Sequence, residues 1–148
     1  MKISDFLSSA DVTIDGAFPD KQKLLSELSR KAGTKLDLPG ERIFSELMKR
    51  EDLGSTGVGS GVAIPHARLQ QVAEPFGMFV RLKKPMEYDA IDGKPVDLVF
   101  LLLLPDSAGG EQPGALASAA RKLRDQKVAA ALRRARDSDE LYRILTAD

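Results

Sequence analysis

The segment PVDLVFLLLL at Pro95–Leu104 carries the strongest structural signal in this sequence. Apolar residues follow one another here, without the polar and apolar alternation of a strand that has one solvent-facing side. A strand that is apolar on both faces is typical of the centre of a sheet covered by helices on both sides. We therefore predict that Pro95–Leu104 is a buried strand of an α/β domain.

Two further segments upstream of this strand have a recognisable residue pattern. Phe76–Leu82 is predicted as a second strand, and the stretch that links it to Pro95 is rich in turn signals. Residues 54–68, GSTGVGSGVAIPHAR, hold four glycines within eight residues and then a β-branched run, which predicts a loop leading into a strand. The carboxylates near the turns show no spacing typical of an acid/base pair, so we expect them to be solvated; they are Glu87, Asp89, Asp92 and Asp97.

Helical periodicity flanks the predicted strands on both sides. Apolar residues at three- and four-residue spacing define a first helix, for which Gly33 is the expected stop, and the same spacing recurs four more times. The whole chain, residues 1–148, is therefore predicted to be a single α/β domain in which helices flank a mixed β-sheet. The predicted helices are Asp20–Ala32, Gly40–Arg50, Pro113–Arg124, Lys127–Arg136 and a short one starting at Ser138.

Composition excludes several classes of function. The 22 Lys and Arg residues balance 22 Asp and Glu residues, so no broad positive field is available for nucleic acid or an anionic membrane. Cysteine is absent and there is one histidine, so we expect no metal site and no cofactor. The longest apolar run, Leu98–Leu104, is too short to span a bilayer, and residues 1–16 lack the apolar core of a secretory signal. Cytoplasm is the expected location.

The C-terminal third is locally basic. Two interpretations remain open for these charges: solvated helix faces, or a contact with an acidic partner. The residues are Arg121, Lys122, Arg124, Lys127, Arg133, Arg134 and Arg136.

His66 is the candidate for chemistry. Imidazole titrates near pH 6.5, so much of it is neutral and nucleophilic at neutral pH. Pro65 fixes its own backbone φ and favours extended geometry at Ile64, which gives the histidine a rigid base. The preceding glycines allow backbone N–H groups to approach an anion. From the residues alone, a structural histidine bonded to a carbonyl remains the alternative.

The glycine-rich loop does not match a nucleotide-binding motif, since it fits neither GxxxxGK[ST] nor GxGxxG. Two arginines flank it. Arg68 follows His66 by two residues and would share its face of an extended segment, while Arg50 ends the second predicted helix and could fold back beside the loop. A guanidinium group suits a phosphoryl group, but both arginines could equally be solvated surface charges.

Taken together, REDLGSTGVGSGVAIPHARL at Arg50–Leu69 resembles the active-site signature of the EIIA domains of the bacterial phosphotransferase system, and in particular their nitrogen-regulatory branch. The family is related to the fructose and mannitol EIIA domains. Residues 85–105, PMEYDAIDGKPVDLVFLLLLP, and the C-terminal DSDELYRILT resemble further stretches of the same family. The resemblance thus extends over nearly the whole chain.

The resemblance implies a function for these residues. It makes His66 the acceptor of a phosphoryl group through its Nε2 atom, with the phosphocarrier NPr as donor. Arg50 matches the arginine that stabilises the phosphate, and Arg68 is a weaker match. The glycine loop would contact the phosphoryl oxygens through Ser55, Thr56, Gly57 and Gly59. Potassium-transport components and sensor kinases are the kinds of partner that the resemblance suggests for regulation.

One position departs from the family pattern. Family members usually carry a second histidine at the start of the helix that follows the long apolar strand, and Gln112 stands there in this chain. A glutamine can donate a hydrogen bond to a phosphoryl oxygen but carries no positive charge. Two alternatives therefore stay beside the phosphoryl-accepting regulator. One is a binding module impaired in phosphotransfer, and the other is a sugar-specific EIIA that passes phosphate to an EIIB-permease, which the lack of an attached EIIB or membrane segment disfavours.

Overall fold

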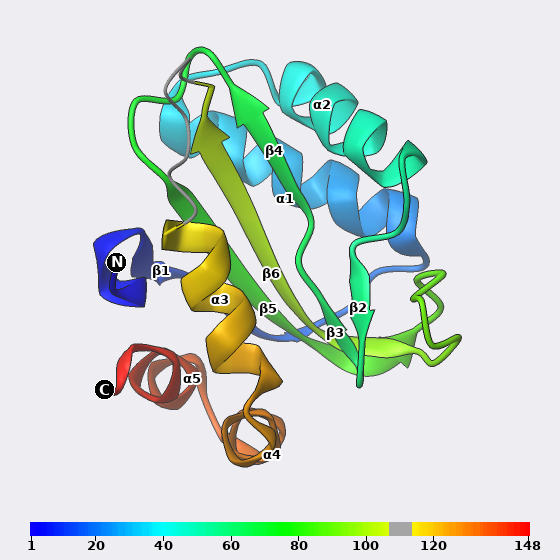
Figure 1. The fold of residues 1–148 in the computed structure, drawn as a ribbon, viewed down its shortest axis with the longest axis vertical. Helices are drawn as coiled ribbons and strands as arrows, with labels where there is room; N and C mark the ends of the chain where they lie inside the picture. Colours follow the sequence, from blue (N-terminus) through cyan, green and yellow to red (C-terminus); the bar gives the residue numbers. More distant parts are fainter. Residues whose placement is uncertain (107–113) are drawn as a thin grey trace.

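The predicted central strand is β6, Val96–Pro105, in which every residue from 98 to 104 is buried. In the computed structural model, which describes residues 1–106 and 114–148, it lies in an open mixed sheet with helices on both faces (Figure 1). The predicted α/β class with a mixed sheet is confirmed. The other strands are β1 (Leu7–Gly16), β2 (Gly57–Gly59), β3 (Val62–Ala63), β4 (His66–Leu69) and β5 (Phe76–Met86).

The strand order is β1-β5-β6-β3-β2, with β4 also paired to β6. β5 runs antiparallel to β6 and parallel to β1, so the sheet mixes both kinds of ladder. In the central pair Phe79 faces Phe100, and their rings pack edge to face with centroids 5.9 Å apart.

Strands β3 and β4 follow one another along the same edge of β6. β3 pairs with Leu98 and Val99, and β4 pairs with the stretch from Leu102 to Pro105. Between them Pro65 has no N–H to give to a ladder, and the N–H of Ile64 turns away to donate to the Thr56 carbonyl at 3.0 Å. This break makes His66 the first residue of β4, at the beginning of a strand anchored to the central one.

The helices divide between the two faces. Helices α1 (Lys21–Leu36) and α2 (Gly40–Asp52) pack on one face, and α3 (Gly114–Arg124), α4 (Gln126–Arg134) and α5 (Ser138–Thr146) pack on the other (Figure 1). A short 3₁₀ helix, Ile3–Asp5, precedes β1. The predicted helices therefore exist, with ends that differ by a few residues.

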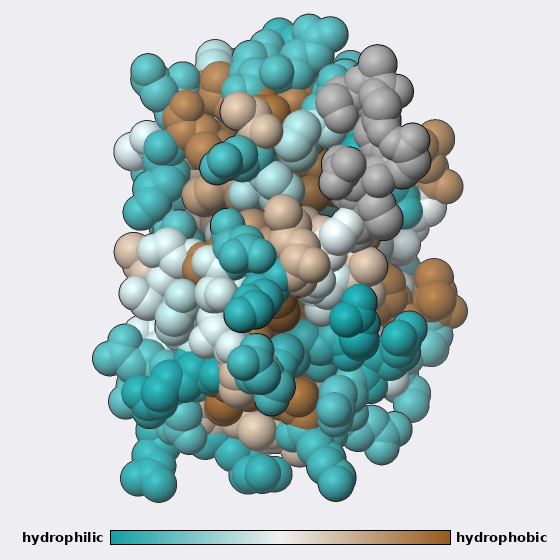
Figure 2. Space-filling view, turned by 60° about the vertical axis from the view of Figure 1, so that its left-hand side comes forward, coloured by the Kyte–Doolittle hydropathy of each residue, from teal (hydrophilic) through white to brown (hydrophobic). Residues whose placement is uncertain are grey.

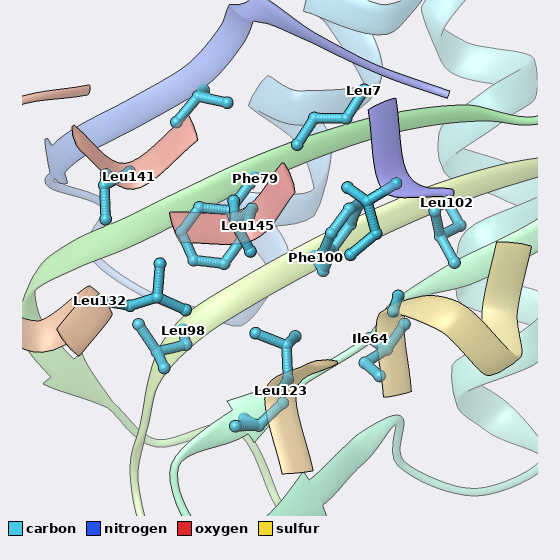
Figure 3. Close-up of a cluster of buried hydrophobic side chains, with 14 of the residues drawn as sticks. Leu7, Ile64, Phe79, Leu98, Phe100, Leu102, Leu123, Leu132, Leu141 and Leu145 are labelled. Atoms are coloured by element: carbon cyan, nitrogen blue, oxygen red, sulfur yellow. The ribbon is translucent and has the colours of Figure 1, made fainter. Parts of the chain in front are cut away.

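The alternating side chains of β6 supply two separate cores. Leu98, Phe100 and Leu102 enter the cluster under α3–α5, together with Ile64 and Leu123 (Figure 3). Val99 and the leucines at 101 and 103 enter the cluster under α1 and α2. The continuous apolar run from Leu98 to Leu104 within this strand is thus explained by helices on both faces.

Gly33 does not end the first helix, contrary to the sequence-based prediction. The helix continues to Leu36 and is capped by Asp37 in the left-handed conformation. A Cβ at Gly33 would lie 2.5 Å from the Leu38 carbonyl oxygen and 3.0 Å from the Gly40 nitrogen. The glycine is therefore required by the close return of the chain into α2, rather than by a turn at its own position.

Strand β1 lies within the first 16 residues, for which the sequence predicts no element. Only Leu7, Asp11 and Val12 of this strand are buried, so the alternation that marks a strand is weak. None of the helices in the described ranges combines the length and apolar character of a bilayer-spanning segment. The face seen in Figure 2 is largely hydrophilic, with hydrophobic residues in small separate patches.

Candidate functional site

His66 is half-buried at the beginning of β4, and its ring is oriented by its own backbone segment. The Nδ1 atom lies 2.8 Å from the carbonyl oxygen of Ile64. A carbonyl only accepts, so the ring is held as the tautomer with the proton on Nδ1. The lone pair of the neutral ring is then on Nε2, which is the nucleophilic atom.

The surroundings keep this ring neutral. Burial lowers the pKa of His66 below its usual 6.5, against the opposing effects of the Ile64 hydrogen bond and of the negative charge of Glu51. The positive charges of Arg50 and Arg68 lower the same pKa further. At neutral pH the imidazole is therefore in the form that can attack phosphorus.

The two arginines approach the site from different elements. Arg50 lies half-buried in the last turn of α2, where its Nη1 donates to the Gly54 carbonyl at 2.8 Å. Arg68 lies on β4 with His66, while Ala67 and Leu69 between and beyond them point into the core. Its Nη1 donates to the Pro105 carbonyl at 3.3 Å. The fold thus brings two guanidinium charges to the imidazole from α2 and from β4.

The glycine-rich loop is tightly bound to the rest of the protein. Ser55 Oγ donates to the Tyr88 carbonyl at 3.2 Å and accepts the N–H of Gly57 at 3.0 Å. A Cβ at Gly57 would lie 2.8 Å from Ala90, and Gly59 has a φ of +104°, so both positions need glycine. The side chain of Ser55 and the N–H of Gly57 are therefore used to hold the loop in the shape that the structure gives it.

Below the loop lies a buried polar cluster that sequence reasoning missed. We call Lys21, Glu51, Thr56 and Tyr88 the Glu51 cluster. The Glu51 carboxylate accepts the ammonium group of Lys21 at 2.9 Å and the N–H of Thr56 at 3.1 Å, and the Thr56 hydroxyl also donates to it. The Tyr88 hydroxyl lies 3.1 Å from Thr56 Oγ1. Every member therefore has a partner inside the protein.

Two further carboxylates hold the turn between β2 and β3. Asp92 accepts the N–H of Ser60 at 2.9 Å, and Asp97 is paired with Arg133, whose Nη2 also donates to the Ser60 carbonyl at 2.9 Å. The expectation of a purely solvated Asp97 was therefore wrong, because α4 lies across the turn and supplies a cation. Arg133 likewise differs from a plain solvated helix charge.

A hollow of about 720 Å³ lies between the β2–β3 turn and helices α3 and α4. Its lining includes Val62, Ile64, Leu123, Arg124 and Ala129 and does not include His66. The phosphoacceptor candidate is therefore not part of this hollow, although Ile64, two residues before it, lines its wall.

Gln112 lies outside the described residues, so its position relative to His66 is not part of the structural account. Within the described ranges no group of three or more His, Asp or Glu side chains could hold a metal ion. The site thus consists of a neutral imidazole and the positive charges of Arg50 and Arg68. This combination suits the transfer of an anionic phosphoryl group.

Comparison with known proteins gives a consistent result. The family model described as "Phosphoenolpyruvate-dependent sugar phosphotransferase system, EIIA 2" matches residues 5–148. A nitrogen regulatory protein of Bradyrhizobium diazoefficiens is 42% identical over 145 residues, which cover 98% of this chain and 95% of that protein.

Solved structures agree with this match. The nitrogen regulatory protein IIA-Ntr of Neisseria meningitidis superposes with a TM-score of 0.91 at 36% identity, over 97% of this chain and 99% of that chain. The mannitol enzyme IIA of Escherichia coli, solved in complex with phosphorylated enzyme IIB, superposes with a TM-score of 0.80 at 15% identity, over 95% of this chain and 97% of that chain. The second likeness concerns the fold alone.

Proposed function

Since this chain belongs to the EIIA 2 family of the phosphoenolpyruvate-dependent sugar phosphotransferase system and groups there with nitrogen regulatory proteins, we propose that His66 accepts a phosphoryl group from a phosphocarrier of the NPr type. The observation that carries the proposal is the 2.8 Å contact between His66 Nδ1 and the Ile64 carbonyl, which leaves Nε2 as the attacking atom. The lowered pKa of His66 supports it, because a neutral ring is required.

The proposed step is an in-line exchange between two imidazoles. Nε2 of His66 forms a bond to phosphorus while the bond from phosphorus to the donor ring breaks, and that electron pair returns to the donor nitrogen. When the donor ring carries a proton on its other nitrogen, it leaves as neutral imidazole and no proton has to move between the proteins. The positive charge that develops on the His66 ring is stabilised at Nδ1–H by the Ile64 carbonyl.

Arg50 and Arg68 are proposed to stabilise the negative oxygens during transfer. Both charges act on the His66 ring, and both side chains are fixed by a backbone carbonyl, so little reorganisation is needed. Of the loop residues, Ser55, Thr56, Gly57 and Gly59 are proposed to form the wall beside the phosphoryl group. Gln112 is proposed to offer a neutral amide in place of a second imidazole.

Regulation would follow from charge. Phosphorylation adds about −1.5 to −2 charges at one surface position, by analogy with other phosphorylated side chains. A partner that contacts the surface around His66 would then distinguish the two states. We propose cytoplasmic partners such as potassium-transport components or sensor kinases.

A second function is favoured by one observation, the Gln112 that replaces the family's usual second histidine. In that case the chain is a binding module that regulates partners with little or no phosphotransfer. The sugar-specific alternative, an EIIA that feeds an EIIB-permease, has no such observation in its favour, and the nitrogen regulatory relatives weigh against it.

The test is the intact mass of the protein at mildly alkaline pH after incubation with enzyme I, NPr and phosphoenolpyruvate. Wild type is expected to gain the mass of one phosphoryl group and His66→Ala to gain none, because the chain has no other histidine. Gln112→His is expected to react faster than wild type, because it restores the second imidazole of the family pattern.

Each other outcome has a definite meaning. A phosphoryl mass gain in the His66→Ala variant would refute the assignment of His66 as the acceptor. A mass gain in Gln112→His without one in wild type would support the binding module and contradict the phosphoryl-accepting regulator.

A further inference from the structure

Glu51 occupies a position that its surroundings make costly. Its side chain is 3% exposed, and it lies in the last turn of α2, the end of a helix that disfavours negative charge. The two residues before it, Lys49 and Arg50, have the charge that such an end favours. A buried carboxylate here requires strong compensation from other elements.

The Glu51 cluster supplies that compensation from three separate elements. Lys21 comes from the first turn of α1, Thr56 from the loop between α2 and β2, and Tyr88 from the segment after β5. The ammonium group of Lys21 lies 2.9 Å from Glu51, 3.2 Å from the Tyr88 carbonyl oxygen and 4.3 Å from the centre of the Tyr88 ring. Burial, with Glu51 beside it, raises the pKa of the Tyr88 hydroxyl far above its usual range, so this group keeps its proton and donates.

A short series of hydrogen bonds leads from this cluster to the catalytic ring. Glu51 accepts the N–H of Thr56, the Thr56 carbonyl accepts the N–H of Ile64 at 3.0 Å, and the Ile64 carbonyl accepts Nδ1 of His66 at 2.8 Å. Thr56 and Ile64 each donate one of these hydrogen bonds through the backbone N–H and accept the next through the backbone carbonyl. The orientation of the Ile64 carbonyl is therefore set from the Glu51 side.

Glu51 also adjoins the residue that supplies the cation. Arg50 precedes it on α2 and bonds to the Gly54 carbonyl, so the chain between α2 and Thr56 is held at both ends. The same contacts therefore fix Arg50 and His66 relative to one another.

From these contacts we infer that Glu51 is a positioning residue for phosphotransfer, which sets the direction of the His66 ring and its placement against Arg50 through Thr56 and Ile64. Glu51 touches neither the ring nor the phosphoryl group. The inference rests on the function proposed above. It goes beyond that function because it gives a role to Glu51 and predicts the tautomer of the His66 ring in the unphosphorylated protein.

The test uses ¹⁵N-histidine-labelled protein and two readouts. The first is the ¹⁵N shifts of the His66 ring at pH 8, which report the tautomer in the absence of any donor. The second is the rate of phosphoryl transfer from NPr, separated into kcat and KM. Glu51→Gln is expected to mix the two tautomers and to lower kcat about 10- to 100-fold with KM unchanged, because the ring is less well oriented and not because NPr binds less tightly.

Two control variants separate positioning from stability. Asp11→Asn removes another buried carboxylate that is paired with a lysine, Lys35 at 3.5 Å, and should leave both readouts at their wild-type values. In Lys21→Met/Glu51→Leu the ion pair is replaced by apolar side chains, so that no unpaired charge is buried. The N–H and the hydroxyl of Thr56 lose their acceptor, so we expect this double variant to unfold at a lower temperature than wild type, to be folded at the assay temperature, and still to transfer slowly.

The outcomes discriminate between the proposals. Wild-type tautomer and kcat in Glu51→Gln, or recovery of kcat in the double variant, would overturn the positioning role. A changed tautomer in Glu51→Gln alongside a wild type that NPr cannot phosphorylate would support the positioning of the ring and refute the proposed function instead.

Discussion

At the scale of single residues, the reactivity of His66 depends on which ring nitrogen carries the proton. The carbonyl of Ile64 decides this, because it can only accept a hydrogen bond. Burial and the nearby arginines lower the pKa of the same ring. The residue is thus both oriented and neutral at the pH where it would work.

Arg50→Gln tests the charge at this site. Removal of the positive charge is expected to raise the pKa of His66 towards 6.5 and to slow phosphoryl transfer about 100-fold, because the transferred oxygens lose a cation. The pKa is measured by NMR titration of the single histidine.

The pH dependence has a definite sign. Since only the neutral ring attacks, transfer to wild type should rise with pH with its midpoint below pH 6.5, and the midpoint for Arg50→Gln should lie at higher pH. Lys49→Gln, an exposed neighbour that pairs with Glu46, should leave the profile in place. An Arg50→Gln protein whose His66 pKa is unchanged or lower would contradict this account.

The sequence identified His66, Arg50 and Arg68 as the residues that could meet, since a motif and an alternation in an extended segment are both local patterns. It did not identify Glu51. An acidic residue at the end of a helix against the dipole is a weak signal in a sequence. Its burial depends on Lys21 and Tyr88, which lie far away along the chain.

At the scale of elements, the contact between α1 and α2 depends on a residue without a side chain. The chain leaves α1, passes Leu38 and enters α2 so closely that Gly33 lies against the backbone of both Leu38 and Gly40. This contact holds α2, and with it Arg50 and Glu51, against the sheet.

Gly33→Ala is therefore expected to destabilise the protein. Alanine gains about 1 kcal/mol of helix propensity over glycine. Its Cβ would lie 2.5 Å from a backbone oxygen that cannot move without shifting α2, so we expect a net loss of about 1–3 kcal/mol in the free energy of unfolding.

Urea unfolding followed by circular dichroism measures this change. Ser26→Ala, at an exposed position of the same helix, is the control and should change stability by less than about 0.5 kcal/mol. A Gly33→Ala protein that is more stable than wild type would show that the close return between the helices is wrong.

Helix positions were largely predictable, because each helix carries its own three- and four-residue periodicity. The strands around the site were less so. β3 and β4 are only two and four residues long, and their pairing with β6 is a long-range property. β1 was not predicted from the sequence, because few of its side chains are buried and its polar and apolar residues do not alternate clearly.

At the scale of the whole molecule, β6 joins the two cores. Its side chains alternate between the helices that carry Arg50 and those on the face of Ile64. The sheet thus fixes the distance between the cation from α2 and the ring on β4. The continuous apolar run at Leu98–Leu104 predicted this central role correctly, because only a strand covered on both faces tolerates it.

If the proposed function holds, phosphorylation would occur at one atom of one residue. The chain has a single histidine, so long-range ¹H–¹⁵N NMR of the phosphorylated, ¹⁵N-histidine-labelled protein identifies the phosphorylated nitrogen without ambiguity. We predict phosphorylation at Nε2, with Nδ1 still facing the Ile64 carbonyl. A phosphoryl group on Nδ1, or phosphorylated protein with an unmodified His66 ring, would contradict the account.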